Sequence, residues 1–211
     1  MTESVLIVGA GSGLSASLAR LCSSNGMKVV LAARDIEKLQ DLKKEIGANT
    51  IKCDATKIKS VTNLFKKTDK IIGVPNLVIY NPSKSLGGSI VDLDPQKAFE
   101  AINITSYGGF LVSQQAAKRM LKKKRGSIFF TGATASIKGF PNSSVFAMGK
   151  FGLRGLAQSL ARELHPQNIH IGHFIIDGGI GHENYGSYKT IHPDEIAKVY
   201  LQFHNQDKSA W

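Results

Sequence analysis

The amino-terminal segment constrains the fold most, because a short apolar run leads directly into a glycine-rich turn. The run covers residues 5–8, and residues 9–13 follow it with the sequence Gly-Ala-Gly-Ser-Gly. A helix-compatible stretch then extends over residues 14–24. In a strand, glycine turn and helix of this kind, backbone N–H groups and the helix amino terminus can receive a pyrophosphate. A plain tight turn is the alternative that the motif alone leaves open.

The glycines of this turn fit no phosphate-binding pattern completely. Read from Gly9, a G-x-G-x-x-G pattern fails at Leu14, and read from Gly11 it ends in an alanine. A G-x-x-x-G-x-G pattern has Gly9 and Gly13 in place but Ser15 at its last position. The sequence therefore leaves the register of the turn open.

Strands and helices are predicted to alternate along the whole chain. Apolar, β-rich runs predict strands over residues 5–8, 28–32, 50–53, 77–80, 127–131 and 170–176. Periodic apolar residues predict helices over residues 14–24, 36–46, 61–67, 95–123, 145–164 and 193–204. Such alternation implies right-handed crossovers and a doubly wound parallel sheet with helices on both faces. No linker or repeat divides residues 1–211, so we expect one domain.

Two of the predicted helices carry start and stop signals. Asp94 precedes Pro95, which is a favourable pair of N-cap and first helical residue. Asp35 is a candidate cap for the helix over residues 36–46, and Gly47 follows its end.

Composition agrees with a soluble α/β domain. A chain of 211 residues can bury a full core, and no apolar run is long enough to span a bilayer. A strand begins almost at the first residue, which leaves no room for a signal peptide. Cys22 and Cys53 make no disulfide framework and are expected to be small buried residues. We therefore expect a cytoplasmic protein.

The chain has a formal net charge of +11. Basic residues cluster at 43–44, 66–67 and 122–125, and the last cluster lies at the expected end of a helix, where cations complement the helix dipole. No aromatic stacking platform or reading-helix motif accompanies the charge, so nucleic-acid binding has only charge in its favour. The excess charge would still attract an anionic dinucleotide.

Later motifs complete a family pattern. Residues 53–56 read Cys-Asp-Ala-Thr, residues 80–83 Tyr-Asn-Pro-Ser, residues 102–105 Ile-Asn-Ile-Thr and residues 177–180 Asp-Gly-Gly-Ile. With the glycine turn and Lys150, their order and spacing resemble the short-chain dehydrogenase/reductase family over nearly the whole chain. The resemblance implies a Rossmann-like doubly wound parallel sheet and a single NAD(P)-binding domain over residues 1–211. The family normally adds a strand after its last helix, and this chain is expected to lack it.

The resemblance also implies which residues contact a cofactor. Asp54 falls where the family's aspartate meets the adenine, and Asn81 follows the fourth strand. Residues 177–180 stand where a Pro-Gly turn usually meets the nicotinamide. The implied cofactor-binding residues are Gly9, Gly11, Ser12, Gly13, Leu14, Arg34, Asp54, Ala55, Asn81, Lys150, Gly179 and Ile180.

The choice between NAD and NADP is expected to depend on the residues after the second strand. A carboxylate there would bind both ribose hydroxyls and repel a 2′-phosphate. Ala33 stands at the usual aspartate position, and Arg34 can pair with that phosphate through its planar fork. We therefore expect NADP(H) rather than NAD(H). The alternatives are that Arg34 stacks on adenine or faces solvent, and that Asp35 is a helix cap or a ribose ligand.

The chain departs from the family pattern at two positions where the family has catalytic residues. The family places a tyrosine one helical turn before its lysine, where the ammonium lowers the phenol pKa from about 10. Here Phe146 takes that position, and Ala133, thirteen residues earlier, takes the position of the catalytic serine. Asn103 and Lys150 match the family's active-site asparagine and lysine. These two are therefore the implied catalytic residues.

Other groups near the expected site could supply the missing proton donor. The candidates are Tyr80, Thr134, Ser143, Ser144, His182, Glu183, Tyr185 and Tyr188. A histidine there would have a suitable pKa for acid–base work, but each candidate could equally be a capping, packing or solvent-facing residue. His165, His170 and His173 lack metal-ligand spacing, so we expect no metal site.

These features support two main functional hypotheses. The leading one is an NADP(H)-binding oxidoreductase that acts on an unidentified carbonyl or alcohol with a non-standard acid or base. The alternative is a catalytically silent dinucleotide-binding protein that serves as a sensor or scaffold. The predicted helices over residues 95–123 and 145–164 resemble the family's subunit-contact helices, so a homodimer or homotetramer is expected.

Overall fold

A six-stranded parallel sheet forms the centre of the computed structural model, which describes residues 2–181 and 190–211. The strands lie in the order β3-β2-β1-β4-β5-β6, and all neighbouring pairs are parallel. Their bounds are β1 Ser4–Val8, β2 Lys28–Ala33, β3 Asn49–Lys52, β4 Leu77–Tyr80, β5 Gly126–Thr131 and β6 Ile169–Phe174. The predicted doubly wound α/β fold is confirmed.

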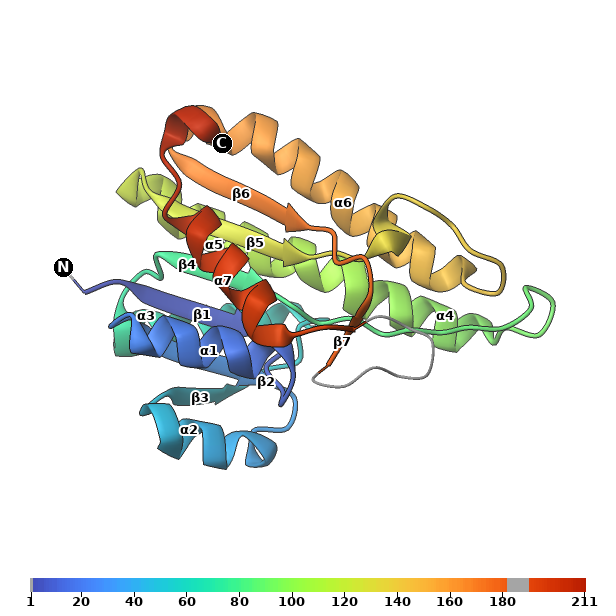
Figure 1. The fold of residues 1–211 in the computed structure, drawn as a ribbon, viewed down its shortest axis with the longest axis horizontal. Helices are drawn as coiled ribbons and strands as arrows, with labels where there is room; N and C mark the ends of the chain where they lie inside the picture. Colours follow the sequence, from blue (N-terminus) through green and yellow to red (C-terminus); the bar gives the residue numbers. More distant parts are fainter. Residues whose placement is uncertain (1, 182–189) are drawn as a thin grey trace.

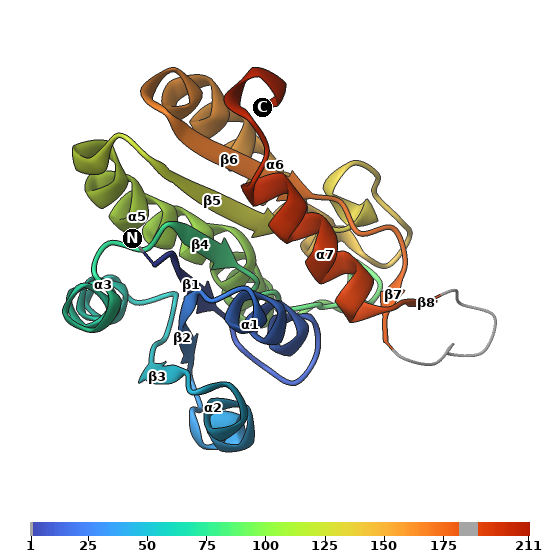
Figure 2. The same ribbon diagram turned by 60° about the vertical axis from the view of Figure 1, so that its left-hand side comes forward.

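Helices cover both faces of this sheet (Figures 1 and 2). One face packs against α1 Leu14–Ser24, α2 Gln40–Ile46 and α7 Pro193–His204. The other packs against α3 Ile58–Ile72, α5 Gly108–Lys123 and α6 Ser144–Leu164. Every residue of β1 is buried as a result, which explains why its sequence is a continuous apolar run rather than an alternating one.

The chain reverses its direction of winding at β1. From β1 it proceeds outward through β2 to β3, and then returns to place β4 on the other side of β1. Loops therefore leave the carboxyl ends of β1 and β4 towards opposite faces, and a crevice opens between them. This crevice is the part of the fold that matters for function.

The long helix predicted over residues 95–123 is interrupted. Helix α4 covers Pro95–Ile102, a π-helical turn covers Asn103–Tyr107, and α5 continues from there. The Tyr80 hydroxyl donates a hydrogen bond to the Ile104 carbonyl within this turn. A Cβ added at Gly108 would collide with the same Tyr80 hydroxyl. The prediction of an uninterrupted helix was wrong because periodicity does not report a contact with a distant tyrosine.

The signals at Asp94, Pro95 and Gly47 are confirmed, whereas several boundaries move, and the helix predicted over residues 36–46 begins only at Gln40. Asp94 Oδ1 accepts a hydrogen bond from the Lys97 N–H at 2.8 Å, and Gly47 ends α2 in the left-handed conformation. The helix predicted over 61–67 is twice as long in the structure, and the strand predicted over 170–176 ends at Phe174. The short 3-10 turns are Glu37–Leu39, Thr134–Ser136, His165–Gln167 and Lys208–Ala210.

Within residues 2–181 and 190–211, no strand joins the six-stranded sheet after α7, and β3 and β6 form its two edges. A small parallel pair, β7 Gly179–Ile180 and β8 Thr190–Ile191, was not predicted (Figure 2). Cys22 and Cys53 are free and buried, as expected. Among the helices described, none is both long and apolar enough to cross a membrane.

Candidate functional site

A cavity of about 550 Å³ lies at the carboxyl ends of the strands on both sides of β1. Its walls come from the glycine turn after β1, the ends of β2 and β3, and the loop that follows β4. In Figure 1 the arrowheads of these strands point to the same edge of the sheet. The cavity occupies the crevice where the strand order reverses, which is where open α/β sheets bind ligands.

Position 9 requires a glycine because of its backbone conformation and the closeness of Pro82. Its φ is +80°, and an added Cβ would lie 2.6 Å from the Pro82 side chain. Gly11 and Gly13 differ, because an added Cβ at either would meet no atom within 4 Å. Gly13 is also the N-cap residue of α1, which has no acidic residue in its first turn. The turn therefore leaves open space over a helix amino terminus, which favours an anion.

Ser15 ties the glycine turn to the loop after β4. Its side chain is 2% exposed, and its hydroxyl donates to the Gly9 carbonyl at 3.1 Å. The Asn81 amide donates to the same hydroxyl at 2.7 Å. A hydroxyl thus fills the place of a third glycine in the G-x-x-x-G-x-G reading. The close approach at Gly9 and the buried Ser15 favour this register over the two others.

The end of β2 brings two cations to the cavity. Arg34 and Lys38 are exposed and both line it. Asp35 also lines it, but its carboxylate accepts a hydrogen bond from the Glu37 N–H at 3.0 Å and so caps the following turn. Helix α2 begins only at Gln40, with Leu39 as its N-cap, so the predicted role of Asp35 as cap of a helix over residues 36–46 is wrong, and its role as a ribose ligand stays a prediction. Lys38 was not predicted from the sequence, although its position four residues after Arg34 was a usable signal.

Asp54 supplies a carboxylate to the opposite wall. Partial burial raises its pKa, but hydrogen bonds from Thr56 outweigh that effect and hold the pKa of this carboxyl below its usual range. The Thr56 N–H donates at 2.9 Å and the Thr56 hydroxyl at 2.7 Å. Asp54 is thus an ionised acceptor beside Ala55, which lines the same cavity.

Lys150 is held inside the protein beside Phe146. Its side chain is 3% exposed, and its Nζ donates to the Thr131 carbonyl at 2.8 Å. The same nitrogen lies 5.6 Å from the centroid of the Phe146 ring, one helical turn earlier. Burial lowers the pKa of Lys150 to about 8. The ammonium therefore contacts a carbonyl oxygen and a ring face, and residue 146 offers it no oxygen.

The turn after β5 contains Ala133, the residue at the expected serine position. The Ala133 N–H donates to the Ser136 hydroxyl at 3.1 Å. The neighbouring Thr134 hydroxyl donates to Asp177 at 2.5 Å, and the Thr134 N–H donates to the Ile176 carbonyl at 3.2 Å. These contacts fix Ile176 and Asp177, which lead into β7, beside the turn that contains Ala133. Gly179 and Ile180 are both exposed in β7.

Asn103 begins the π-helical turn and is half-buried there. The turn packs closely on α6, because a Cβ added at Gly149 would lie 2.9 Å from Thr105. Gly149 directly precedes Lys150 in the chain. The structure therefore brings the segment that carries Asn103 next to the segment that carries Lys150.

The candidate proton donors differ in their burial and hydrogen bonding. Tyr80 is fully buried, and burial raises the pKa of its hydroxyl far above the usual range, which makes it unsuitable as an acid. The Ser144 hydroxyl is buried, and no protein group among the described residues hydrogen-bonds to it. His182, Glu183, Tyr185 and Tyr188 lie outside the described residues.

His165 and His170 are packed among aromatic rings. His170 stacks on Trp211 with ring centroids 4.4 Å apart, and it also lies 4.4 Å from Phe203. The His165 Nε2 accepts a hydrogen bond from the Ile171 N–H at 3.0 Å. Among the described residues, no group of three or more His, Cys, Asp or Glu side chains could hold a metal ion.

Comparisons with known proteins agree on one family. The family model described as short chain dehydrogenase matches residues 3–180. An uncharacterized oxidoreductase of Staphylococcus aureus is 28% identical, over 99% of this chain and 94% of the relative. The crystal structure of a short-chain dehydrogenase from Rhodopseudomonas palustris has a TM-score of 0.88 and 33% identity, and covers 99% of this chain and 94% of its own. A metagenomic short-chain oxidoreductase, solved in complex with NADP, has a TM-score of 0.87 and 25% identity. The match covers 98% of this chain and 92% of that oxidoreductase.

The two kinds of glycine in the turn make a matched pair for mutation. We expect Gly9→Ala to lower the free energy of unfolding by about 1–3 kcal/mol, because it adds both a clash with Pro82 and backbone strain. Gly11→Ala should change it by less than about 0.5 kcal/mol, since its Cβ meets open space. Urea unfolding of the two variants measures the difference. Equal effects would show that Pro82 does not constrain the turn.

Proposed function

Because the chain belongs to the short-chain dehydrogenase family, we propose that it is an oxidoreductase that binds NADP(H) in the cavity at the carboxyl ends of β1 and β4. It would pass hydride between this cofactor and a carbonyl or alcohol. The observation that carries the proposal is that one cavity joins the glycine turn, Arg34 and Asp54. The glycine turn suits the pyrophosphate of a dinucleotide, Arg34 suits a phosphate on the ribose, and the ionised Asp54 suits the adenine.

Each part of the cofactor has a group that fits it chemically. The pyrophosphate lies over the open turn and the start of α1, the adenine beside Asp54, and the nicotinamide end towards α6 and β7. Lys150 holds the nicotinamide ribose. The proposed contacts are Gly9, Gly11, Ser12, Gly13, Leu14, Arg34, Asp54, Ala55, Asn81, Lys150, Gly179 and Ile180.

Charge at the end of β2 supports NADP(H) over NAD(H). Ala33 offers no carboxylate to repel a 2′-phosphate, and the Asp35 carboxylate is engaged by the Glu37 N–H. Arg34 and Lys38 place two cations in the same cavity. Arginine pairs with phosphate through two parallel hydrogen bonds, and a lysine adds a point charge. The NADP complex of the metagenomic relative is consistent with this choice.

The chemistry at the nicotinamide end is expected to be slow. When bound, NADP(H) supplies or accepts the hydride. We propose that Phe146 and Ala133 occupy the places of the usual tyrosine and serine, since the Phe146 ring lies beside the Lys150 ammonium. Asn103 and Lys150 then remain to orient the reactants. Loss of a positioned proton donor typically lowers the rate about 10²- to 10⁴-fold. Turnover remains measurable because the site still holds the cofactor and the substrate next to each other.

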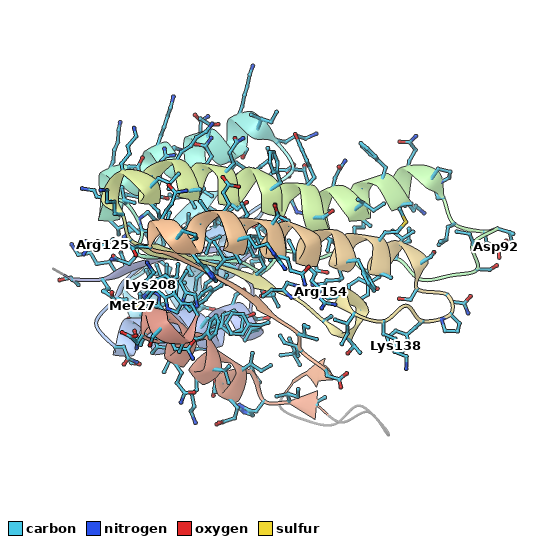
Figure 3. All side chains as sticks on the ribbon, turned by 90° about the horizontal axis from the view of Figure 1, so that it is seen from above. Met27, Asp92, Arg125, Lys138, Arg154 and Lys208 are labelled. Atoms are coloured by element: carbon cyan, nitrogen blue, oxygen red, sulfur yellow. The ribbon has the colours of Figure 1, made fainter. Side chains whose placement is uncertain are left out.

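We further propose that the protein forms a homodimer or homotetramer through α4, α5 and α6. Large apolar side chains are exposed on these helices and on the π-helical turn, namely Phe99, Tyr107, Phe110, Met148 and Phe151. Helices α5 and α6 run alongside each other over the sheet (Figure 3), and a cavity of about 380 Å³ between them is lined by Phe110, Leu121, Leu156 and Leu160 among others. A second copy would cover this apolar surface.

The state of association can be measured directly. Sedimentation at micromolar concentration should show a dimer or tetramer, and Phe151→Glu should shift it to a smaller species by burying a charge in the contact. Asp41→Asn, an exposed change on α2 at the other face of the sheet, serves as control. A wild-type protein that sediments only as monomer would rule out the association.

Cofactor preference tests the role of Arg34. The wild-type protein should bind NADPH more tightly than NADH, and Arg34→Asp should weaken NADPH binding by roughly 10- to 100-fold. Lys44→Asp makes the same change of charge at an exposed site of α2 and should leave the preference intact. Fluorescence titration of each of the three proteins with NADPH and NADH measures all six affinities. Equal affinities in the wild type, or no binding of either dinucleotide, would refute the proposed cofactor.

Restoring two hydroxyls tests the proposed active site. The double variant with Ala133→Ser and Phe146→Tyr should reduce simple test carbonyls about 10²-fold faster than the wild type, because a proton donor and an oxyanion donor act together. Each single variant should gain less. NADPH affinity must remain unchanged for the comparison to report chemistry. A double variant that binds NADPH normally yet gains nothing would favour the silent sensor or scaffold.

A further inference from the structure

His173 lies on the side of β6 that faces α6. It pairs in register with Phe130 of β5, and it lies on the same face of β6 as Ile169 and Ile171, which pack into the core beneath α3, α5 and α6. Lys150 reaches into the same layer from α6 and donates to the Thr131 carbonyl. The imidazole and the ammonium therefore share one layer of the protein.

Gly132 brings the two groups close together. A Cβ added at Gly132 would lie 2.5 Å from the His173 Cε1 and 2.6 Å from its Nε2, so the ring fits only because residue 132 has no side chain. Gly132 directly follows Thr131, whose carbonyl accepts the hydrogen bond from Lys150. The His173 ring therefore packs against the residue that directly follows Thr131, and the Thr131 carbonyl binds the Lys150 ammonium.

The hydrogen bonding of both groups is incomplete. The His173 Nε2 is buried, and no protein group among the described residues bonds to it. An unpaired buried nitrogen is costly, so a purely structural ring would be expected to have a partner. An ammonium has three N–H donors, and the Thr131 carbonyl takes one of those of Lys150.

Electrostatics keeps the imidazole neutral. Burial, and then the positive charges of Lys150 and Arg154, lower the pKa of His173 to about 4. Arg154 lies on α6 (Figure 3), one turn beyond Lys150, and borders His173 in a cavity of about 240 Å³. The other walls of that cavity come from Ala157, Gln158, Ala161, Ile171 and Ile175 and bring no further charge. A neutral ring can accept a hydrogen bond from an ammonium, whereas a protonated ring would repel it.

We propose that His173 is a positioning residue for Lys150, because its Nε2 beneath α6, unpaired among the described residues, is an acceptor to which the ammonium can turn one of its remaining N–H groups. The inference rests on the proposed function, in which Lys150 holds the cofactor ribose. It gives the lysine a polar neighbour at a site where residue 146 offers a ring face instead of a phenolic oxygen. His173 touches neither substrate nor cofactor and acts only through Lys150.

The titration of Lys150 tests this proposal without any cofactor. Its ε-carbon can be followed by NMR in protein labelled with ¹³C-lysine, with Lys150→Met to identify the signal. His173→Phe keeps a ring but removes the nitrogens, and it should lower the Lys150 midpoint by about one pH unit, because the ammonium loses a polar neighbour in a buried site. His173→Gln restores a hydrogen-bonding group and should keep the midpoint near that of the wild type.

His170→Phe is the matched control. His170 lies on the same strand, with both ring nitrogens buried and no hydrogen-bond partner among the described residues, but it stacks on Trp211 on the other face of the sheet. This variant should leave the Lys150 midpoint unchanged. A Lys150 midpoint that is the same in wild type and His173→Phe would overturn the proposal.

A reciprocal measurement covers the case in which His173→Phe does not fold. In Lys150→Met, the midpoint of the His173 ring should rise, since one nearby positive charge has been removed. An unchanged His173 midpoint would also overturn the proposal. Neither titration requires dinucleotide, so failure to bind NADP(H) would count against the proposed function alone.

Discussion

The hydrogen bond between Asn81 and Ser15 joins the two loops between which the cavity opens. Ser15 also bonds back to the Gly9 carbonyl, and the Gly9 backbone lies against Pro82. These contacts fasten the turn after β1 to the loop after β4 at the point where the strand order reverses. Because both loops leave buried strands, the spacing between them is fixed by the sheet. The opening over Gly11 and Gly13 is therefore built into the fold.

The site divides into two parts with different chemistry. Around the glycine turn, polar and charged groups remain: two cations after β2, an ionised Asp54 and the open amino terminus of α1. Around Lys150, the neighbouring residues are a phenylalanine ring, the Thr131 carbonyl and Ala133 in the next turn. In our proposal the first part binds the cofactor, and the second part carries Phe146 and Ala133 at the positions of the usual proton donors. The protein interior then keeps Lys150 in place.

Much of the fold follows from local sequence signals. Continuous apolar runs predicted the buried parallel strands, and Asp94, Pro95 and Gly47 marked helix ends correctly because caps depend on neighbours in the chain. Apart from Lys38, the features of the site that were missed depend on distant residues. The π-helical turn involves Tyr80 and Gly108, and the register of the glycine turn involves Ser15 and Asn81, which are 66 residues apart. From the sequence His173 was considered only as a possible metal ligand, because its position near Lys150 arises only when β6 lies under α6.

The central claim is that the cofactor half of the site is intact while the proton-donating half is altered. A crystal structure of the protein with NADPH tests it most directly. We expect the 2′-phosphate between Arg34 and Lys38, the pyrophosphate over residues 11–14, and the nicotinamide beside the Phe146 ring with Lys150 against its ribose. NADPH bound outside this cavity, or a nicotinamide next to another ionisable side chain with Phe146 turned away, would contradict the account.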